Sequence, residues 1–219
     1  MGKVIKQGVV LSAFMLITAV LLSCAAQQKK VDASQYSGFL HDYSRLEKMP
    51  DDGGLRWISD ALQGYDKVLI DPVVLHPDPG TSRVVLLNGI KVHLDNGLRA
   101  ALKNKVSLVS DVGPGVVRLR PAITGVVSET EGLKAYEFIP IALIFAGAKT
   151  ATGTRAKTAQ VFLEVELSDS ETGNVVGQVV RKGLGKQAET DALTFKDVQP
   201  ILDEWIKNGS ENLARMLKR

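Results

Sequence analysis

The only cysteine of this chain, Cys24, directly follows its first long apolar run, and this limits how the protein can fold. Lys3 and Lys6 precede the run, which carries no charge from Val9 to Leu22. As a helix the run would measure about 21 Å, short of the roughly 30 Å hydrocarbon core of a bilayer. We therefore expect a cleaved export signal rather than a permanent membrane span. An exported chain with one thiol forms no internal disulfide, so its fold must rest on a hydrophobic core.

The end of the apolar run indicates the kind of signal. Leu21-Leu22-Ser23-Cys24 resembles the bacterial lipobox, with Leu three positions before the cysteine and a small residue just before it. The resemblance implies that the leader is cut before Cys24, that Cys24 carries a diacylglycerol thioether, and that its new amino group is acylated, for example with palmitate. A chance cysteine after an ordinary signal peptide, or in an uncleaved anchor, is the alternative.

The residue after the cysteine indicates in which membrane the protein is anchored. Enteric lipoproteins that stay at the inner membrane tend to carry Asp there, and this chain has Ala25. By that resemblance we expect a lipid anchor in the outer membrane, with the domain facing the periplasm. Three acyl chains would hold the protein at the membrane essentially permanently, since even one chain gives measurable binding.

Composition narrows the possible partners. Removing residues 1–23, which hold two lysines and no acid, leaves 196 residues with 25 basic and 24 acidic side chains, a net charge of +1. No basic stripe is present, so a nucleic-acid partner is excluded. Residues 24–35 are small and polar and predict a lipidated flexible tether. Residues 36–219 have the size of a single domain.

Alternating apolar and polar residues predict strands in the middle of the chain. Residues 67–75 form the first, and Pro72 should bulge it or place it at an edge, because proline has no N–H. Residues 106–109 form a short strand. Residues 117–127 form a longer one, with one buried face and one wet face. The buried face would hold Val117, Leu119, Ile123 and Val127, and the wet face Arg118, Arg120 and Thr124.

A hairpin is predicted over residues 161–181. Its first strand alternates two sets of residues, and a polar turn follows. One set is Val161, Leu163, Val165 and Leu167, and the other is Phe162, Glu164 and Glu166. In that turn Asp169 can accept backbone hydrogen bonds and Gly173 can adopt a positive φ. Turn chemistry explains these acidic residues without a bound calcium ion, which would need a longer run of oxygen ligands.

Helical spacing of apolar residues predicts two long helices. The first covers residues 88–104, with Asn88 as its N-cap, and the second covers residues 198–218, with Asp197 as its N-cap. Gly209 would kink or divide the second helix. Trp205 lies on its apolar stripe, so we expect this side chain to be buried against the sheet. Residues 36–46 place Phe39, Tyr43 and Leu46 at helical spacing, which predicts one or two turns that dock on the domain.

The run 138–148 is more apolar than the connection between two strands requires. We consider two alternatives, a buried connector and a contact surface for a partner or the membrane. The candidate contact residues are Phe138, Ile141, Leu143, Ile144 and Phe145.

No catalytic or metal-binding motif stands out. The three histidines have no zinc-ligand spacing, and the lone cysteine is assigned to lipid. No nucleophile elbow or phosphate-binding loop is present. A carboxylate pair for acid–base chemistry could be drawn from Asp42, Asp60, Asp66 or Asp71, with nothing to select among them. We therefore predict no catalytic residues, no metal, no cofactor and no enzyme activity.

Two segments resemble a known family. Residues 36–46, YSGFLHDYSRL, and residues 65–73, YDKVLIDPV, are together similar to a family of small Gram-negative lipoproteins known only as a domain of unknown function. The resemblance runs from about Cys24 to the C-terminus and implies no activity, substrate or site residues. It leaves the function to be argued from the fold and its surfaces.

The elements together predict an α+β domain. We expect a mainly antiparallel sheet with the two long helices packed on one face. The leading functional hypothesis is a membrane-anchored, non-catalytic periplasmic protein that binds an envelope protein or cell-wall material. The alternative is a hydrolase acting on cell-envelope polymers, which a cleft holding two carboxylates about 5–10 Å apart would favour.

Overall fold

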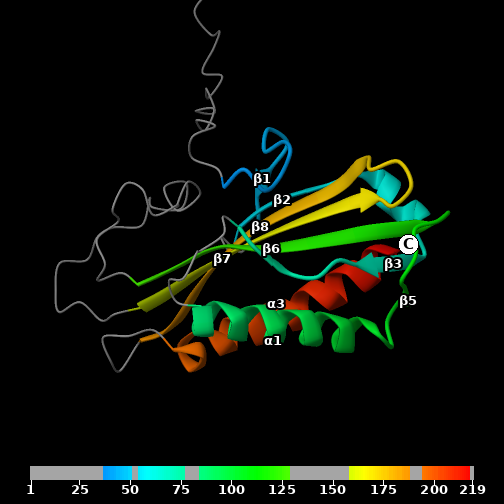
Figure 1. Ribbon diagram of the computed structural model, residues 1–219. Helices are drawn as coiled ribbons and strands as arrows, with labels where there is room; N and C mark the ends of the chain where they lie inside the picture. Colours follow the sequence, from blue (N-terminus) through cyan, green and yellow to red (C-terminus); the bar gives the residue numbers. More distant parts are fainter. Residues whose placement is uncertain (1–36, 51–53, 77–83, 129–157, 188–193, 218–219) are drawn as a thin grey trace, which may run out of the picture. The chain divides into compact units, whose positions relative to one another are not determined.

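The computed structural model describes residues 37–50, 54–76, 84–128, 158–187 and 194–217. Residues 31–219 group into one compact unit. Eight strands form a single mixed sheet in the order β1-β2-β8-β7-β6-β3-β5, with β4 paired to β6 (Figure 1). The strands are β1 (Glu47–Lys48), β2 (Gly54–Ile58), β3 (Lys67–Ile70), β4 (Val74–Leu75), β5 (Ser107–Val109), β6 (Val116–Ser128), β7 (Thr158–Asp169) and β8 (Val175–Gln187).

Three long antiparallel strands, β6, β7 and β8, form the body of the sheet, and β2 and β1 extend it at one edge. The predicted hairpin is confirmed as β7 and β8. In its turn, Asp169 Oδ1 accepts hydrogen bonds from the backbone N–H groups of Glu171 and Thr172 at 3.1 and 2.7 Å. Gly173 has φ 74°, a left-handed conformation that glycine adopts at little cost. Both predicted roles in the turn are therefore confirmed.

The other edge of the sheet is parallel. β3 runs parallel to both β5 and β6, because the helix α1 (Val84–Leu102) carries the chain back across one face between β3 and β5. The α+β class and the antiparallel long strands are as predicted. The crossover through α1 makes the whole sheet mixed.

Pro72 was predicted to bulge the first strand or to place it at an edge, and it instead interrupts the strand. The strand expected over residues 67–75 divides into β3 and β4, which pair with successive parts of β6. Pro72 has no N–H to donate, and the N–H of Val73 turns away from the sheet to the Asp95 carboxylate on α1, at 2.7 Å. Lys91 lies 2.7 Å from the other oxygen of Asp95. The side chain of Asp95 thus replaces the missing strand partner.

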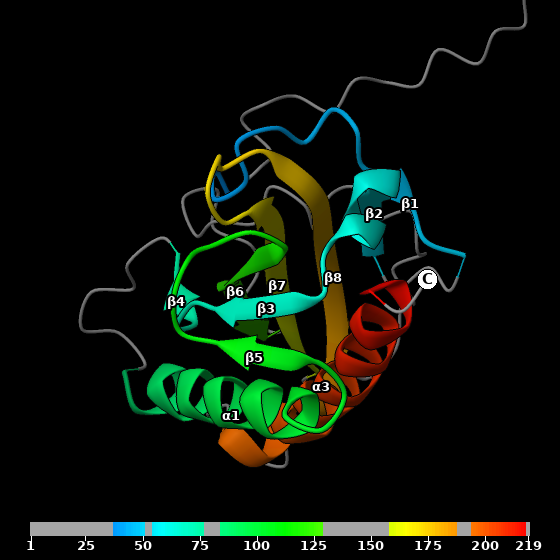
Figure 2. The ribbon, with the colours of Figure 1, turned by 90° about the vertical axis from the view of Figure 1, so that its right-hand side faces the viewer.

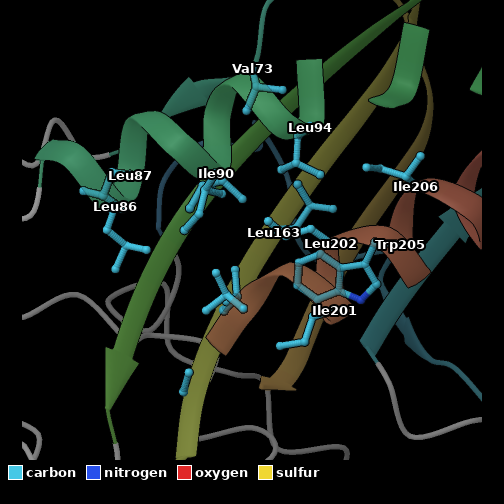
Figure 3. Close-up of a cluster of buried hydrophobic side chains, with 14 residues drawn as sticks. Val73, Leu86, Leu87, Ile90, Leu94, Leu163, Ile201, Leu202, Trp205 and Ile206 are labelled. Carbon is cyan, nitrogen blue, oxygen red and sulfur yellow. The ribbon is translucent and has the colours of Figure 1, made fainter. Parts of the chain in front are cut away.

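The two helices, α1 and α3 (Phe195–Leu217), cover the same face of the sheet, as predicted (Figure 2). A further short element, the 3₁₀ helix η2 (Asp60–Gly64), follows β2. The largest apolar cluster lies between the helices and strands β6 and β7 (Figure 3). Trp205 is 7% exposed within it, which confirms its predicted burial. No helix among the described residues is long and apolar enough to cross a membrane.

Both predicted N-caps are wrong. α1 begins at Val84, so Asn88 lies inside the helix. α3 begins at Phe195, and the carboxylate of Asp197 accepts hydrogen bonds from the N–H and the hydroxyl of Thr194, at 2.7 and 2.8 Å. Asp197 thus binds back to Thr194, as the N3 residue of a capping box binds the N-cap residue. α3 also continues through Gly209 as one helix.

Residues 37–46, which we call the clasp, pack against the face of the sheet opposite the helices (Figure 2). Phe39, Tyr43 and Leu46 contact a small apolar cluster of Leu40, Leu55 and Val180. The predicted docking is therefore confirmed, but the predicted helical turns are wrong. The N–H groups of Phe39 and Leu40 donate to the Ser37 and Tyr43 hydroxyls instead of to helical carbonyls.

Candidate functional site

A cavity of about 350 Å³ opens between the helix layer and the sheet, and we call it the α3 groove. Its lining includes side chains from both helices and from β2, β6, β7 and β8. The apolar part of the lining comprises Ile58, Leu94, Leu98, Leu102, Leu119, Pro121, Leu163, Val165, Leu167, Val179, Trp205, Ile206, Leu213 and Met216. This volume lies at the lower end of the range of about 300–1,000 Å³ found for small-molecule sites.

Two glycines of β8 allow the N-terminal half of α3 to lie close to the sheet. A Cβ atom at Gly183 would lie 2.3 Å from Ile201 Cγ2, and one at Gly185 would lie 2.3 Å from the Asp197 carbonyl oxygen. The N-terminal half of α3 therefore lies directly on β8. The C-terminal half of α3, from Trp205 to Met216, forms one wall of the groove, and its Leu213 packs in an apolar cluster with Leu119 and Leu167 of the sheet.

Polar residues gather at the end of the groove next to β2. Arg56, Arg181 and Arg215 contribute to its lining, together with Asn208 and Asn212. A second surface hollow shares Arg56, Ile58, Asn212, Arg215 and Met216 with the groove and adds Glu47 and Trp57. The groove is thus apolar along most of its length and polar where it meets this hollow.

A second feature lies on the opposite face, where Glu164, Glu166 and Gln178 form a buried polar cluster beneath the clasp. Their exposed fractions are 0%, 1% and 0%. Arg120 Nη1 donates to Glu166 Oε1 at 2.6 Å, and His41 Nδ1 lies 3.2 Å from Glu166 Oε2. The Tyr43 hydroxyl donates to Glu164 Oε2 at 2.7 Å. Side chains of the clasp therefore bind both carboxylates.

The prediction that this face of β6 is wet is confirmed at Arg118, which is exposed, but is wrong at Thr124. Thr124 is 5% exposed, and Phe162 on the neighbouring strand is 3% exposed. The physical reason is the clasp, which lies far from β6 and β7 in the sequence and covers both. The one local signal was Phe162, an apolar residue in line with Glu164 and Glu166, which suggested an apolar partner on that face.

Burial raises the pKa of the Glu164 carboxyl, against the opposing effect of its hydrogen-bonding neighbours. Burial, followed by the nearby charge of Glu164, also raises the pKa of the Tyr43 hydroxyl. Glu164 Oε1 and Gln178 Oε1 have no hydrogen-bond partner. An acceptor without a donor is costly when buried, so the ionised form of Glu164 destabilises the folded protein relative to the protonated form.

We expect Glu164→Gln to remove a pH dependence from the stability. The folded protein holds the Glu164 proton to higher pH than the unfolded chain does, so wild-type stability should decline as pH rises above about 4.5, the ordinary pKa. Gln cannot ionise, so the advantage of the variant should grow with pH. Urea melts at a series of pH values measure the difference. Glu171→Gln, in the exposed turn, is the control, and parallel wild-type and Glu164→Gln curves would contradict the expectation.

The carboxylates proposed from the sequence have separate local roles. Asp42 accepts from the N–H of Ser44 at 2.8 Å, and Asp71 forms an ion pair with Arg118 at 2.9 Å. Asp66 lies 3.3 Å from Lys67, and Asp60 begins η2. Within the described ranges, no group of three or more His, Cys, Asp or Glu side chains could hold a metal ion.

The other candidate residues lie outside the described residues. These are the lipid-attachment residue Cys24 and the possible contact surface Phe138, Ile141, Leu143, Ile144 and Phe145. The α3 groove was not predicted. Some of its lining residues, such as Leu163, Val165 and Trp205, were predicted as apolar positions on separate elements, and no local pattern indicates that a cavity remains between them.

The fold and its relatives define the class of protein. The chain is an α+β protein with both helices on one face of a mixed sheet. It belongs to the family described as "Protein of unknown function (DUF3313)", whose model matches residues 35–208. It is 34% identical over 194 residues to the uncharacterized lipoprotein YdcL of Escherichia coli (strain K12), covering 84% of this chain and 86% of the relative. The predicted resemblance to a Gram-negative lipoprotein family is therefore confirmed, and the chain is a lipoprotein of the cell envelope.

Solved structures are similar at lower levels. The PelC dodecamer from Paraburkholderia phytofirmans is 14% identical with a TM-score of 0.40, covering 75% of this chain and 96% of that one. The hypothetical protein CT253 from Chlamydia trachomatis is 9% identical with a TM-score of 0.41, covering 68% and 98%.

Proposed function

We propose that this lipoprotein is a non-catalytic binding protein that takes up an apolar ligand in the α3 groove. The observation that carries the proposal is a cavity of about 350 Å³ within the helix–sheet layer, walled mainly by aliphatic side chains and Trp205. Protein interiors are normally close-packed, so an open apolar cavity of this size favours a ligand.

The location of the carboxylates supports binding over hydrolysis. Glu164 and Glu166 are adjacent on one face of β7, as a hydrolase pair would be, but they lie beneath the clasp with exposed fractions of 0% and 1%. A general acid must come within hydrogen-bond reach of its substrate. In this arrangement both side chains serve to attach the clasp instead.

The proposal places the protein at the outer membrane, with the domain in the periplasm. The lipobox-like end of the leader and Ala25 support this address, and a curated lipoprotein relative supports the anchor. Metabolic labelling with radioactive palmitate should mark the wild type and leave Cys24→Ala unlabelled. Equal labelling of both proteins would refute attachment at Cys24.

Ligand binding can be tested with a neutral fluorescent probe, N-phenyl-1-naphthylamine. The protein would be residues 24–219 with Cys24→Ala, which keeps the whole compact unit and removes the lipid. We expect saturable fluorescence enhancement that Val179→Trp abolishes, because the indole would occupy the groove. Val112→Trp, at a residue that is 61% exposed, is the matched control and should bind the probe normally.

Two results would count against the groove as the binding site. One is probe binding that is equal in Val179→Trp and Val112→Trp. The other is no saturable binding by the wild type. A thermal melt of each variant must show a cooperative transition, so that lost binding cannot be attributed to an unfolded domain.

A further inference from the structure

We propose that the ligand of the α3 groove is an anionic amphiphile, a single alkyl chain with a phosphate head. The inference rests on the proposed function and adds the chemical class of the ligand. The alkyl chain would lie along the aliphatic wall formed by α1, α3 and β7. The phosphate would lie at the end next to β2, where the groove meets the second hollow.

Charge at this end supports the assignment. Arg56 and Arg215 line both the groove and the hollow, one from β2 and the other from α3. Both side chains are exposed, and neither forms an ion pair with a carboxylate of the described residues. Arg215 donates to the side-chain amide oxygen of Asn212. Two guanidinium groups on facing elements suit an anion, since arginine binds phosphate through paired N–H donors.

The other charged residues at this end of the groove also favour an anionic head group. Arg181 adds a third guanidinium to the lining and donates to the Met49 thioether at 3.2 Å. The acids nearby are Glu211 in the groove and Glu47 in the hollow. Among the described residues that line the groove and the hollow, three arginines stand against two acids, an excess of one positive charge. A cationic head group would be repelled by this excess charge, and a neutral head group would not compensate it.

The apolar part of the groove sets the shape of the tail. Its half-buried apolar residues include Leu98 on α1, Val165 on β7 and Val179 on β8, and the buried side chains of Leu94, Leu102 and Leu163 lie behind them. Trp205 and Ile206 form the side contributed by α3. A volume at the lower end of the small-molecule range favours one chain over the two chains of a bilayer phospholipid.

The test uses amphiphiles that share one tail. Dodecyl phosphate and dodecyltrimethylammonium, each below its micelle concentration, would displace N-phenyl-1-naphthylamine from residues 24–219 carrying Cys24→Ala. We expect dodecyl phosphate to compete at least tenfold more tightly. Arg56→Gln and Arg215→Gln should each weaken dodecyl phosphate about tenfold, as loss of a charge-assisted contact would. Lys196→Gln, an exposed charge change at the other end of α3, should change nothing.

The outcomes separate the ligand class from the groove. If the probe binds and the two amphiphiles compete equally, the anionic head is refuted while the groove stands as a binding site. The same holds if the arginine variants keep full preference for dodecyl phosphate. If the probe itself does not bind, the proposed binding of an apolar ligand in the groove is refuted. Probe affinity should be unchanged in Arg56→Gln and Arg215→Gln, and this checks that both variants fold.

Discussion

Trp205→Ala is expected to lower the free energy of unfolding by about 3–5 kcal/mol, the usual cost of removing a large buried aromatic side chain. Trp205 is 7% exposed and lies between α3 and the sheet, in the cluster of Figure 3. Its ring packs against Gly183, where an added Cβ atom would lie 2.8 Å from Trp205 Cζ2. No neighbouring side chain from Gly183 can move into the space that the substitution leaves. Urea melts of the unlipidated chain measure the loss.

The control for this substitution is Lys207→Ala, two residues along the same helix and exposed. It should change the free energy of unfolding by less than about 0.5 kcal/mol, as exposed substitutions do. A loss below about 1 kcal/mol for Trp205→Ala would contradict the packing of α3 on β8. A domain of ordinary stability could unfold outright, and that result would agree with the expectation.

Arg120→Met is expected to destabilise the protein by roughly 3 kcal/mol, because it leaves a buried carboxylate without its main partner. Arg120 Nη1 lies 2.6 Å from Glu166 Oε1, and the Glu166 side chain is 2% exposed. His41, another neighbour of Glu166, has a side chain that is 72% exposed and lies 3.2 Å away. His41 is therefore a weak substitute for the guanidinium. Chemical denaturation at pH 7 measures the loss.

Arg118→Met provides a matched control on the same strand and the same face. Arg118 pairs with Asp71, but its side chain is 45% exposed, so the loss should stay below about 1 kcal/mol. The double variant Arg120→Met, Glu166→Leu should recover most of the stability, since apolar replacement of a buried ion pair is often nearly neutral. Equal losses of stability for Arg118→Met and Arg120→Met would contradict the expectation that the buried Glu166 carboxylate needs Arg120 as its partner.

Local patterns predicted most of the elements. Alternation identified β6, β7 and β8, helical spacing identified α1 and α3, and Pro72 indicated where the first strand breaks. These features depend on residues close together in the sequence, where periodicity and backbone chemistry act directly. The helix starts were missed because capping depends on single side chains. At α3, Asp197 accepts from Thr194 instead of capping the helix itself.

Features built from distant residues could not be predicted. The clasp and β7 are separated by more than a hundred residues, so the sequence gives no local sign that Tyr43 binds Glu164. The groove likewise depends on how close α3 lies to β8 at each point, which Gly183 and Gly185 determine. Glycine in a strand can indicate a bulge, a bend or a close approach, and only the packing selects among them.

An amphiphile bound in the α3 groove should be visible in a crystal. The most direct test is a crystal structure of residues 24–219 with Cys24→Ala, grown with a dodecyl phosphate brominated at the end of its tail. We expect an anomalous bromine peak near Leu98, Val165 and Val179, with the phosphate between Arg56 and Arg215. Bromine bound elsewhere, or a groove filled by the protein's own side chains, would contradict it.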